Sequence, residues 1–280
     1  MLRISDLSFA YSRRKPRVID HLSMTIGRGG IYGLLGVNGV GKTTLLNLIA
    51  GLFTPATGSV MLDGNDTRLR KPSVLADIFF LPENPAFSSM TIKEFIRIYS
   101  GFYPKFSHQQ MLSYLSDFGL NDRMKLSSIS TGQRKKALLS FAIASNTSLL
   151  LLDEPTNGLD IPGKSTLRSI LASCADDNRT IVISTHQISD IEPLLDHLII
   201  MNGGRIQVNT SVSEIISKLR FIITSSPALL SEALYSRPVF SGNIAILPND
   251  NESDTCIDLE SFFYLCMSNP SAIASLFPAS

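Results

Sequence analysis

At residues 36–43 the chain reads Gly36-Val37-Asn38-Gly39-Val40-Gly41-Lys42-Thr43, which fits the phosphate-binding pattern G-x-x-x-x-G-K-S/T. Glycines let the backbone curl so that successive N–H groups point at phosphate oxygens. Lys42 adds a positive charge for the β- and γ-phosphates, and the Thr43 hydroxyl suits Mg²⁺. We therefore expect a set of loop residues to bind the phosphates of a nucleotide: Gly36, Asn38, Gly39, Gly41, Lys42, Thr43 and Thr44.

The residues on either side of this loop provide the setting that it requires. Residues 31–35 form a short apolar run, which is typical of a buried strand. Residues 44–50 carry apolar side chains at helical spacing, and Gly51 follows where a helix is expected to end. The sequence therefore predicts an α/β domain in which the loop joins a buried strand to a helix.

Length and composition limit the alternatives. A chain of 280 residues accommodates one large α/β domain, or a domain of typical size with a small appendix. The formal net charge of +1 argues against a nucleic-acid partner. No apolar run is long enough to span a bilayer, so we expect any action at a membrane to occur from the cytoplasmic side through a partner.

Residues of about 85–145 have a different, helical pattern. Thr91 and Glu94 match a capping box at the start of the first helix, and further helices are expected over residues 108–118 and from Gly132 onward. An aromatic and aliphatic stripe runs along the first helix. Two interpretations stay open for that stripe: a small local core, or a docking face for another protein.

Two buried strands deliver polar side chains to one edge of the expected sheet. Residues 148–152 form a mostly apolar run that ends at Asp153 and Glu154, and residues 180–184 form another that is followed by His186. Asp153 suits Mg²⁺, which prefers oxygen ligands. Glu154 is placed to polarise an attacking water, and His186 lies at the edge where ligands bind in open α/β folds.

The order of these motifs resembles that of ATP-binding-cassette (ABC) ATPases, the nucleotide-binding subunits of ABC transporters. Ser130-Thr131-Gly132-Gln133 resembles the family's LSGGQ signature, residues 153–160 its Walker B and D-loop segment, and Ser184-Thr185-His186 its switch histidine. The resemblance covers about residues 1–208. It implies a P-loop NTPase of ABC type with an N-terminal antiparallel β subdomain, a helical insertion and a small C-terminal α+β appendix.

The same resemblance implies roles for individual residues. The ATPase domain would occupy residues 1–210 and the appendix residues 211–280, for which dimer stabilisation is the default expectation. Within the appendix the residue pattern predicts helices over residues 213–219, 227–235 and 257–267 and extended segments over residues 220–224 and 243–247. Tyr11 would stack on adenine, and Lys42, Glu154 and His186 would act in hydrolysis. Two cassettes would face head to tail, so the remaining groups would act across the dimer: Ser130, Gly132 and Gln133 on the partner's ATP, and Asp160 on the partner's phosphate loop.

Two positions depart from the family's pattern. Glu83 stands where a glutamine is usual, and a carboxylate there is a further candidate Mg²⁺ ligand beside Thr43 and Asp153. Thr131 replaces the first glycine of the signature, which adds bulk near the nucleotide.

The leading hypothesis is a subunit that hydrolyses ATP, with Mg²⁺, to energise transport through a separate membrane-spanning permease. Residues 102–106 and the last helix resemble exporter ATPases of the drug, antibiotic and polymer-export type, which favours export. We expect a peripheral protein at the cytoplasmic face of the cell membrane, paired with a second ABC ATPase subunit in a homodimer or heterodimer. The alternatives are a soluble ABC-type ATPase acting on ribosomes or nucleic acid, and a regulatory module without turnover.

Overall fold

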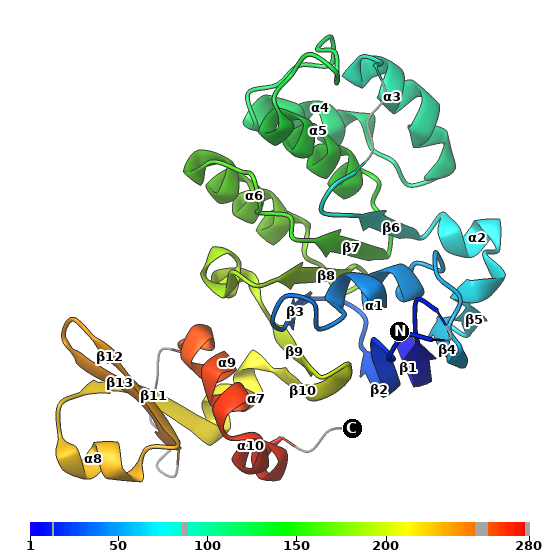
Figure 1. Cartoon of the computed structure of the whole chain (residues 1–280). Coiled ribbons are helices and arrows are strands. Elements are labelled where there is room, and N and C mark those ends of the chain that lie inside the picture. Colours follow the sequence, from blue (N-terminus) through cyan, green and yellow to red (C-terminus); the bar gives the residue numbers. More distant parts are fainter. Residues whose placement is uncertain (13, 86–88, 250–256, 278–280) are drawn as a thin grey trace.

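A six-stranded sheet forms the centre of the computed structural model, which describes residues 1–12, 14–85, 89–249 and 257–277 (Figure 1). Its strand order is β10-β9-β3-β8-β7-β6, and only the pair β9–β10 is antiparallel. Every residue of β3, β7 and β8 is buried, as expected for parallel strands covered on both faces. The strands are β3 (Ile31–Leu35), β6 (Ile78–Leu81), β7 (Leu149–Asp153), β8 (Thr180–Thr185), β9 (His197–Asn202) and β10 (Arg205–Ser211).

A second, antiparallel sheet covers the helix that follows the phosphate loop. Its order is β2-β1-β4-β5. Apolar residues of these strands share one core cluster with α1 (Lys42–Ile49). The predicted N-terminal β subdomain is therefore confirmed, with strands β1 (Leu2–Phe9), β2 (Ile19–Ile26), β4 (Thr57–Leu62) and β5 (Asn65–Asp66) and, after them, the short helix α2 (Pro72–Leu75).

The helical insertion comprises α3 (Ile92–Tyr99), α4 (His108–Asp117) and α5 (Thr131–Ala144), gathered beyond the β6 end of the sheet (Figure 1). The expected capping box is present: the Glu94 amide donates to Thr91 Oγ1 at 3.2 Å, and the Thr91 amide donates to Glu94 Oε2 at 2.8 Å. The apolar stripe divides, because Ile92 and Ile96 are buried whereas Phe102 is 65% exposed. After β7 the chain forms α6 (Ile161–Cys174).

The chain after β10 adds helices and a small antiparallel sheet of order β11-β13-β12. The helix expected over residues 227–235 is wrong at its end: α8 stops at Glu232, because Tyr235 pairs with Ile246 across β12 and β13. A final helix was not expected and follows the Asn269 cap. The elements are α7 (Val212–Lys218), β11 (Leu219–Thr224), α8 (Pro227–Glu232), β12 (Tyr235–Val239), β13 (Gly242–Pro248), α9 (Leu259–Ser268) and α10 (Pro270–Leu276).

These C-terminal elements share a hydrophobic core with the central sheet. One continuous cluster of buried side chains includes Leu152 of β7, Ile188 beside the switch histidine, Ile215 of α7 and Phe262 of α9. Helix α9 packs against the short turn Ile188–Asp190. Among the described residues, no helix has both the length and the apolar character needed to cross a membrane.

Candidate nucleotide site

The strand register brings the predicted motifs to one edge of the central sheet. Leu35, the last residue of β3, pairs with Thr185, and Asp153 pairs with Ser184 on the neighbouring strand. β6 runs parallel to β7 and ends at Leu81, shortly before Glu83. The phosphate loop, Asp153 with Glu154, His186 and Glu83 therefore all follow the carboxyl ends of adjacent strands, where open α/β sheets bind ligands.

A cavity of about 370 Å³ lies over this edge. Gly41 faces it with φ at +112°, and a Cβ there would lie only 3.1 Å from Ile19 Cδ1, so this position needs glycine. Gly36, Asp153 and His186 lie close by without lining this cavity. The lining consists of Tyr11, Val18, Asn38, Gly39, Gly41, Lys42, Thr43, Thr44, Glu83 and Glu154.

Lys42 is a buried cation at the base of the cavity. Its Nζ donates to the Gly36 carbonyl oxygen at 2.6 Å and lies 4.0 Å from Glu154 Oε1. Burial lowers the pKa of Lys42, and the nearby carboxylates, Glu154 first among them, oppose that shift. An ammonium already removed from water interacts strongly with an anion that enters the cavity, which suits phosphate binding.

Thr43 and Asp153 place oxygen atoms side by side next to the cavity. Thr43 Oγ1 donates to Asp153 Oδ2 at 2.8 Å, and Ser184 Oγ donates to Asp153 Oδ1 at 2.5 Å. In the described part of the chain no group of three or more His, Cys, Asp or Glu residues could hold a metal. A hydroxyl and one carboxylate nevertheless fit Mg²⁺, which in nucleotide sites takes few protein ligands and completes its shell with phosphate and water.

Glu154 and His186 form the polar pair nearest to this oxygen cluster. His186 Nδ1 lies 2.8 Å from Glu154 Oε1, and the Glu154 side chain is 8% exposed. The other oxygen, Oε2, is buried and has no hydrogen-bond partner within the described residues. Because a buried acceptor without a partner is costly, this oxygen is suited to accept a proton from a water molecule.

Tyr11 stands at the mouth of the cavity. Its ring is 56% exposed and meets the rings of Phe9 and Phe53 edge to face, with centroids 5.2 and 5.9 Å away. Its hydroxyl lies 2.8 Å from Thr44 Oγ1. The two phenylalanines and this contact orient the ring while part of it stays open, as stacking on a base requires.

Glu83 also lines the cavity, on the side of β6. Its Oε1 accepts a hydrogen bond from Asn157 Nδ2 at 2.9 Å. The third carboxylate expected from the sequence is therefore present at this edge of the sheet, beside Asp153 and Glu154.

The signature segment lies at the N-terminus of α5 and is absent from the residues that line the cavity around Lys42. Ser130 and Gln133 cap the helix reciprocally, with the Gln133 amide donating to Ser130 Oγ at 3.2 Å. A Cβ on Gly132 would lie 2.9 Å from the Gly158 carbonyl oxygen, so the signature packs tightly on the D-loop. Lys136 Nζ pairs with Asp160 Oδ1 at 2.7 Å and lowers the pKa of that carboxyl.

Three further polar side chains support the site and were not assigned from the sequence. Ser184 holds Asp153, Asn157 holds Glu83, and Lys135 Nζ donates to the Glu154 carbonyl oxygen at 2.5 Å. Ser184 and Asn157 lie within the quoted motifs, so their place in the sequence could have identified them as residues of the site. Lys135 is a buried residue of the long helix α5, and only this burial indicates that it is a residue of the site.

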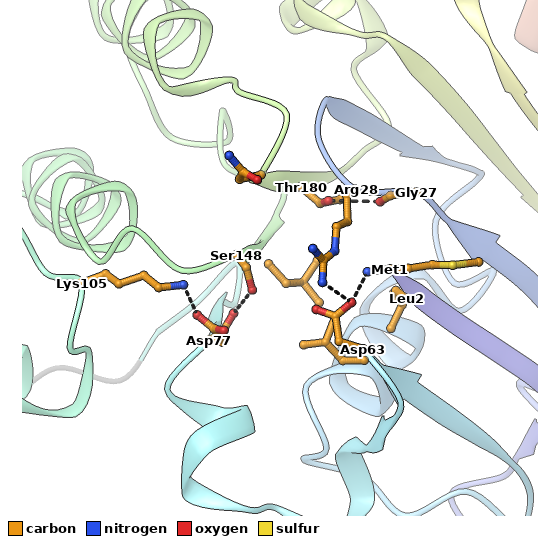
Figure 2. Close-up of a pocket in the computed structure, with 12 residues that line it drawn as sticks. Met1, Leu2, Gly27, Arg28, Asp63, Asp77, Lys105, Ser148 and Thr180 are labelled. Atoms are coloured by element: carbon orange, nitrogen blue, oxygen red, sulfur yellow. Dashed lines mark hydrogen bonds and ion pairs between the residues drawn. The ribbon is translucent and has the colours of Figure 1, made fainter.

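A second polar cavity, of about 320 Å³, lies at the opposite edge of the sheet (Figure 2). Ser148 and Thr180 line it at the starts of β7 and β8, whereas the nucleotide site lies beyond their ends. Its cations are held by carboxylates: the Met1 amino group and Arg28 both contact Asp63 Oδ1, at 2.6 and 2.9 Å, and Lys105 contacts Asp77 at 2.7 Å. None of the phosphate-loop residues lines this cavity.

The fold and the site together define a P-loop nucleotide hydrolase with a signature segment held away from its own phosphate loop. A family model described as ABC transporter matches residues 19–157. The bacitracin transport ATP-binding protein BcrA of Bacillus licheniformis is 33% identical over 213 residues, covering 74% of this chain and 68% of that protein. The SkfA peptide export ATP-binding protein SkfE of Bacillus subtilis (strain 168) is 30% identical, covering 76% of this chain and 90% of that protein.

A solved structure titled "Structure of ATP binding subunit of ABC transporter" superimposes with a TM-score of 0.70 at 24% identity, covering 77% of this chain and 91% of that one. The chain belongs to the ABC transporter family, as an ATP-binding subunit. It binds ATP and hydrolyses it to energise transport. The family and its relatives thus confirm the function expected from the motifs.

Proposed function

We propose that this subunit energises the export of an antibiotic or a peptide through a separate membrane-spanning permease, working peripherally at the cytoplasmic face of the membrane. Two relatives support this proposal: BcrA is a bacitracin transport protein, which points to an antibiotic substrate, and SkfE is a peptide export protein, which points to the direction of transport. Substrates of that kind are carried by the permease, so no pocket for them is needed in this chain.

The observation that carries the mechanism is the pairing of Glu154 with His186 beside Lys42. The phosphate loop and the Lys42 ammonium bind the β- and γ-phosphates, and Tyr11 stacks on the adenine ring. Glu154 accepts the proton of the attacking water, while His186, 2.8 Å from its Oε1, orients the carboxylate. Mg²⁺ would be held by Thr43 and Asp153, with Glu83 as a further candidate, and would neutralise phosphate charge.

The signature would act in a dimer. Within one subunit Ser130, Gly132 and Gln133 lie outside the lining of the nucleotide cavity, so a partner subunit must supply them to the bound ATP. The N-terminus of α5 then directs its helix dipole toward the γ-phosphate. Asp160 would meet the partner's phosphate loop. Loss of the γ-phosphate removes these contacts, which lets the dimer open and drives the permease.

Glu154→Gln tests the hydrolytic mechanism. The amide keeps the shape of the side chain but cannot take a proton, so we expect turnover to fall at least about 100-fold, within the range of a lost general base. ATP binding should persist, and size-exclusion chromatography with ATP should show a stable dimer. Glu232→Gln, an exposed position on α8, is the matched control. Turnover by Glu154→Gln at the parent rate would remove Glu154 from this role.

Purification from native membranes in mild detergent tests the transport partner and the composition of the dimer. A polytopic membrane protein recovered in stoichiometric yield supports the proposal, and the presence or absence of a second cassette separates heterodimer from homodimer. Recovery of ribosomes or nucleic acid instead would contradict it.

A further inference from the structure

The backbone of Glu154 adopts a conformation that non-glycine residues rarely occupy. Its φ is +47°, in the left-handed region, where a Cβ crowds the following carbonyl. On one side the Glu154 amide donates to the Ser184 carbonyl oxygen at 3.0 Å and to Ser184 Oγ at 3.2 Å. On the other side its carbonyl oxygen accepts the Lys135 ammonium at 2.5 Å. A strained peptide of this kind persists only because its surroundings hold it.

Lys135 is an unusual residue to find in this place. It is 6% exposed and lies in α5 among buried apolar neighbours such as Leu138 and Leu139. An ammonium removed from water is costly unless opposite charge compensates it. Burial lowers the pKa of Lys135, and the carboxylates of Glu83, Glu154 and Asp153 act against that shift, with Glu83 the strongest of the three. The hydrogen bond that this buried ammonium makes is the one to the Glu154 carbonyl oxygen.

We propose that Lys135 is a positioning residue for ATP hydrolysis, which holds the Glu154 peptide in its strained conformation through the hydrogen bond to the Glu154 carbonyl oxygen. The proposal rests on the role given above to Glu154.

The position of Lys135 has a consequence for communication between subunits. It lies five residues after Ser130 on the helix that begins with the signature. In the proposed dimer, a displacement of α5 would therefore act on the Glu154 carbonyl through this hydrogen bond.

Two substitutions test this role. Lys135→Gln retains a donor for the Glu154 carbonyl but removes the charge, and Lys135→Met removes both. We expect kcat for ATP to fall about tenfold in Lys135→Gln and by up to about 100-fold in Lys135→Met, as for a displaced catalytic group. KM for ATP should change less than about threefold, because the phosphate loop is untouched. Lys71→Met, an exposed lysine before α2, should retain the parent values.

Binding of a fluorescent ATP analogue and the thermal midpoint, measured on every variant, separate loss of turnover from loss of folding. If Lys135→Met does not fold, the kcat of Lys135→Gln decides alone.

A parent-like kcat in Lys135→Gln and Lys135→Met would overturn the positioning role. Glu154→Gln in the same assay separates this proposal from the one on which it rests. Turnover in Glu154→Gln would contradict the role of Glu154 itself. Loss of turnover in Glu154→Gln, together with parent-like kcat in the Lys135 variants, would contradict only the positioning role of Lys135.

Discussion

Replacement of Phe262 by alanine tests whether the C-terminal elements fold as one unit with the cassette. Phe262 is fully buried on α9, with its ring 5.7 Å from that of Phe277 at an interplanar angle of 84°. The same core cluster contains Ile188, next to the switch histidine, and Leu152 of the central sheet. A cavity at this position therefore weakens a core that both parts of the molecule share.

The expected cost follows from the size of the deleted group. Truncation of a buried phenylalanine to alanine lowers the free energy of unfolding by about 3–5 kcal/mol. For a chain of this length, each kcal/mol lowers the thermal midpoint by about 2–3 °C, so the midpoint should fall by about 6–15 °C. Phe240→Ala is the matched control: that ring is fully exposed at the end of the β12–β13 hairpin, and its loss should cost no more than about 0.5 kcal/mol.

Two probes follow the transition. The chain contains no tryptophan, so far-UV circular dichroism reports the whole fold and release of a fluorescent ATP analogue reports the cassette. We expect both probes to move together in Phe262→Ala, because a shared core unfolds cooperatively. Nucleotide release at the parent temperature, with an earlier partial loss of dichroism, would show that the appendix unfolds by itself and would refute the shared-core argument.

Two further predictions concern the nucleotide cavity. Tyr11→Ala should raise KM for ATP about tenfold or more, because base stacking contributes roughly 1–3 kcal/mol. Tyr11→Phe loses only the contact with Thr44 and should change KM far less. Steady-state kinetics of the two variants tests this, and equal effects on KM would assign the contribution to the hydroxyl instead of the ring. Glu83→Gln should retain measurable ATPase activity, because the amide oxygen still accepts the Asn157 hydrogen bond and Asp153 is still present as a candidate Mg²⁺ ligand. Complete loss of phosphate release in this variant would show that the carboxylate is required.

The cassette was predictable because its signals are local. A buried parallel strand is a short apolar run, so the strands that end at Leu35, Asp153 and Thr185 could be identified without knowledge of their neighbours. Capping also acts over a few residues, which is why the start of α3 at the Thr91 cap was predictable. The motifs that directly follow these strands could therefore be placed as accurately as the strands themselves.

What the sequence could not supply depends on contacts between distant residues. Tyr235 lies in a strand because Ile246 pairs with it, and a helical pattern over residues 227–235 contains no trace of that partner. The packing of α9 on Ile188–Asp190 joins segments about 70 residues apart. The role of Lys135 could not be predicted either, because no residue near it in the chain indicates that its ammonium contacts the Glu154 carbonyl oxygen.

A continuous chain of hydrogen bonds connects the phosphate loop to the end of the site, and its rigidity is uneven. Thr43 donates to Asp153, Ser184 donates to Asp153 and accepts from the Glu154 amide, and these groups all belong to buried strand ends or to the first turn of α1. The last member, His186, is 34% exposed and follows β8 on a turn that packs against α9. Asp153 and Ser184 are buried in the sheet, so we expect the adjustable contact at the strand ends to be the one between Glu154 and His186. In the proposed dimer the site would form when two subunits meet and dissolve after hydrolysis, and movement at this contact would change the orientation of the carboxylate without disturbing Asp153.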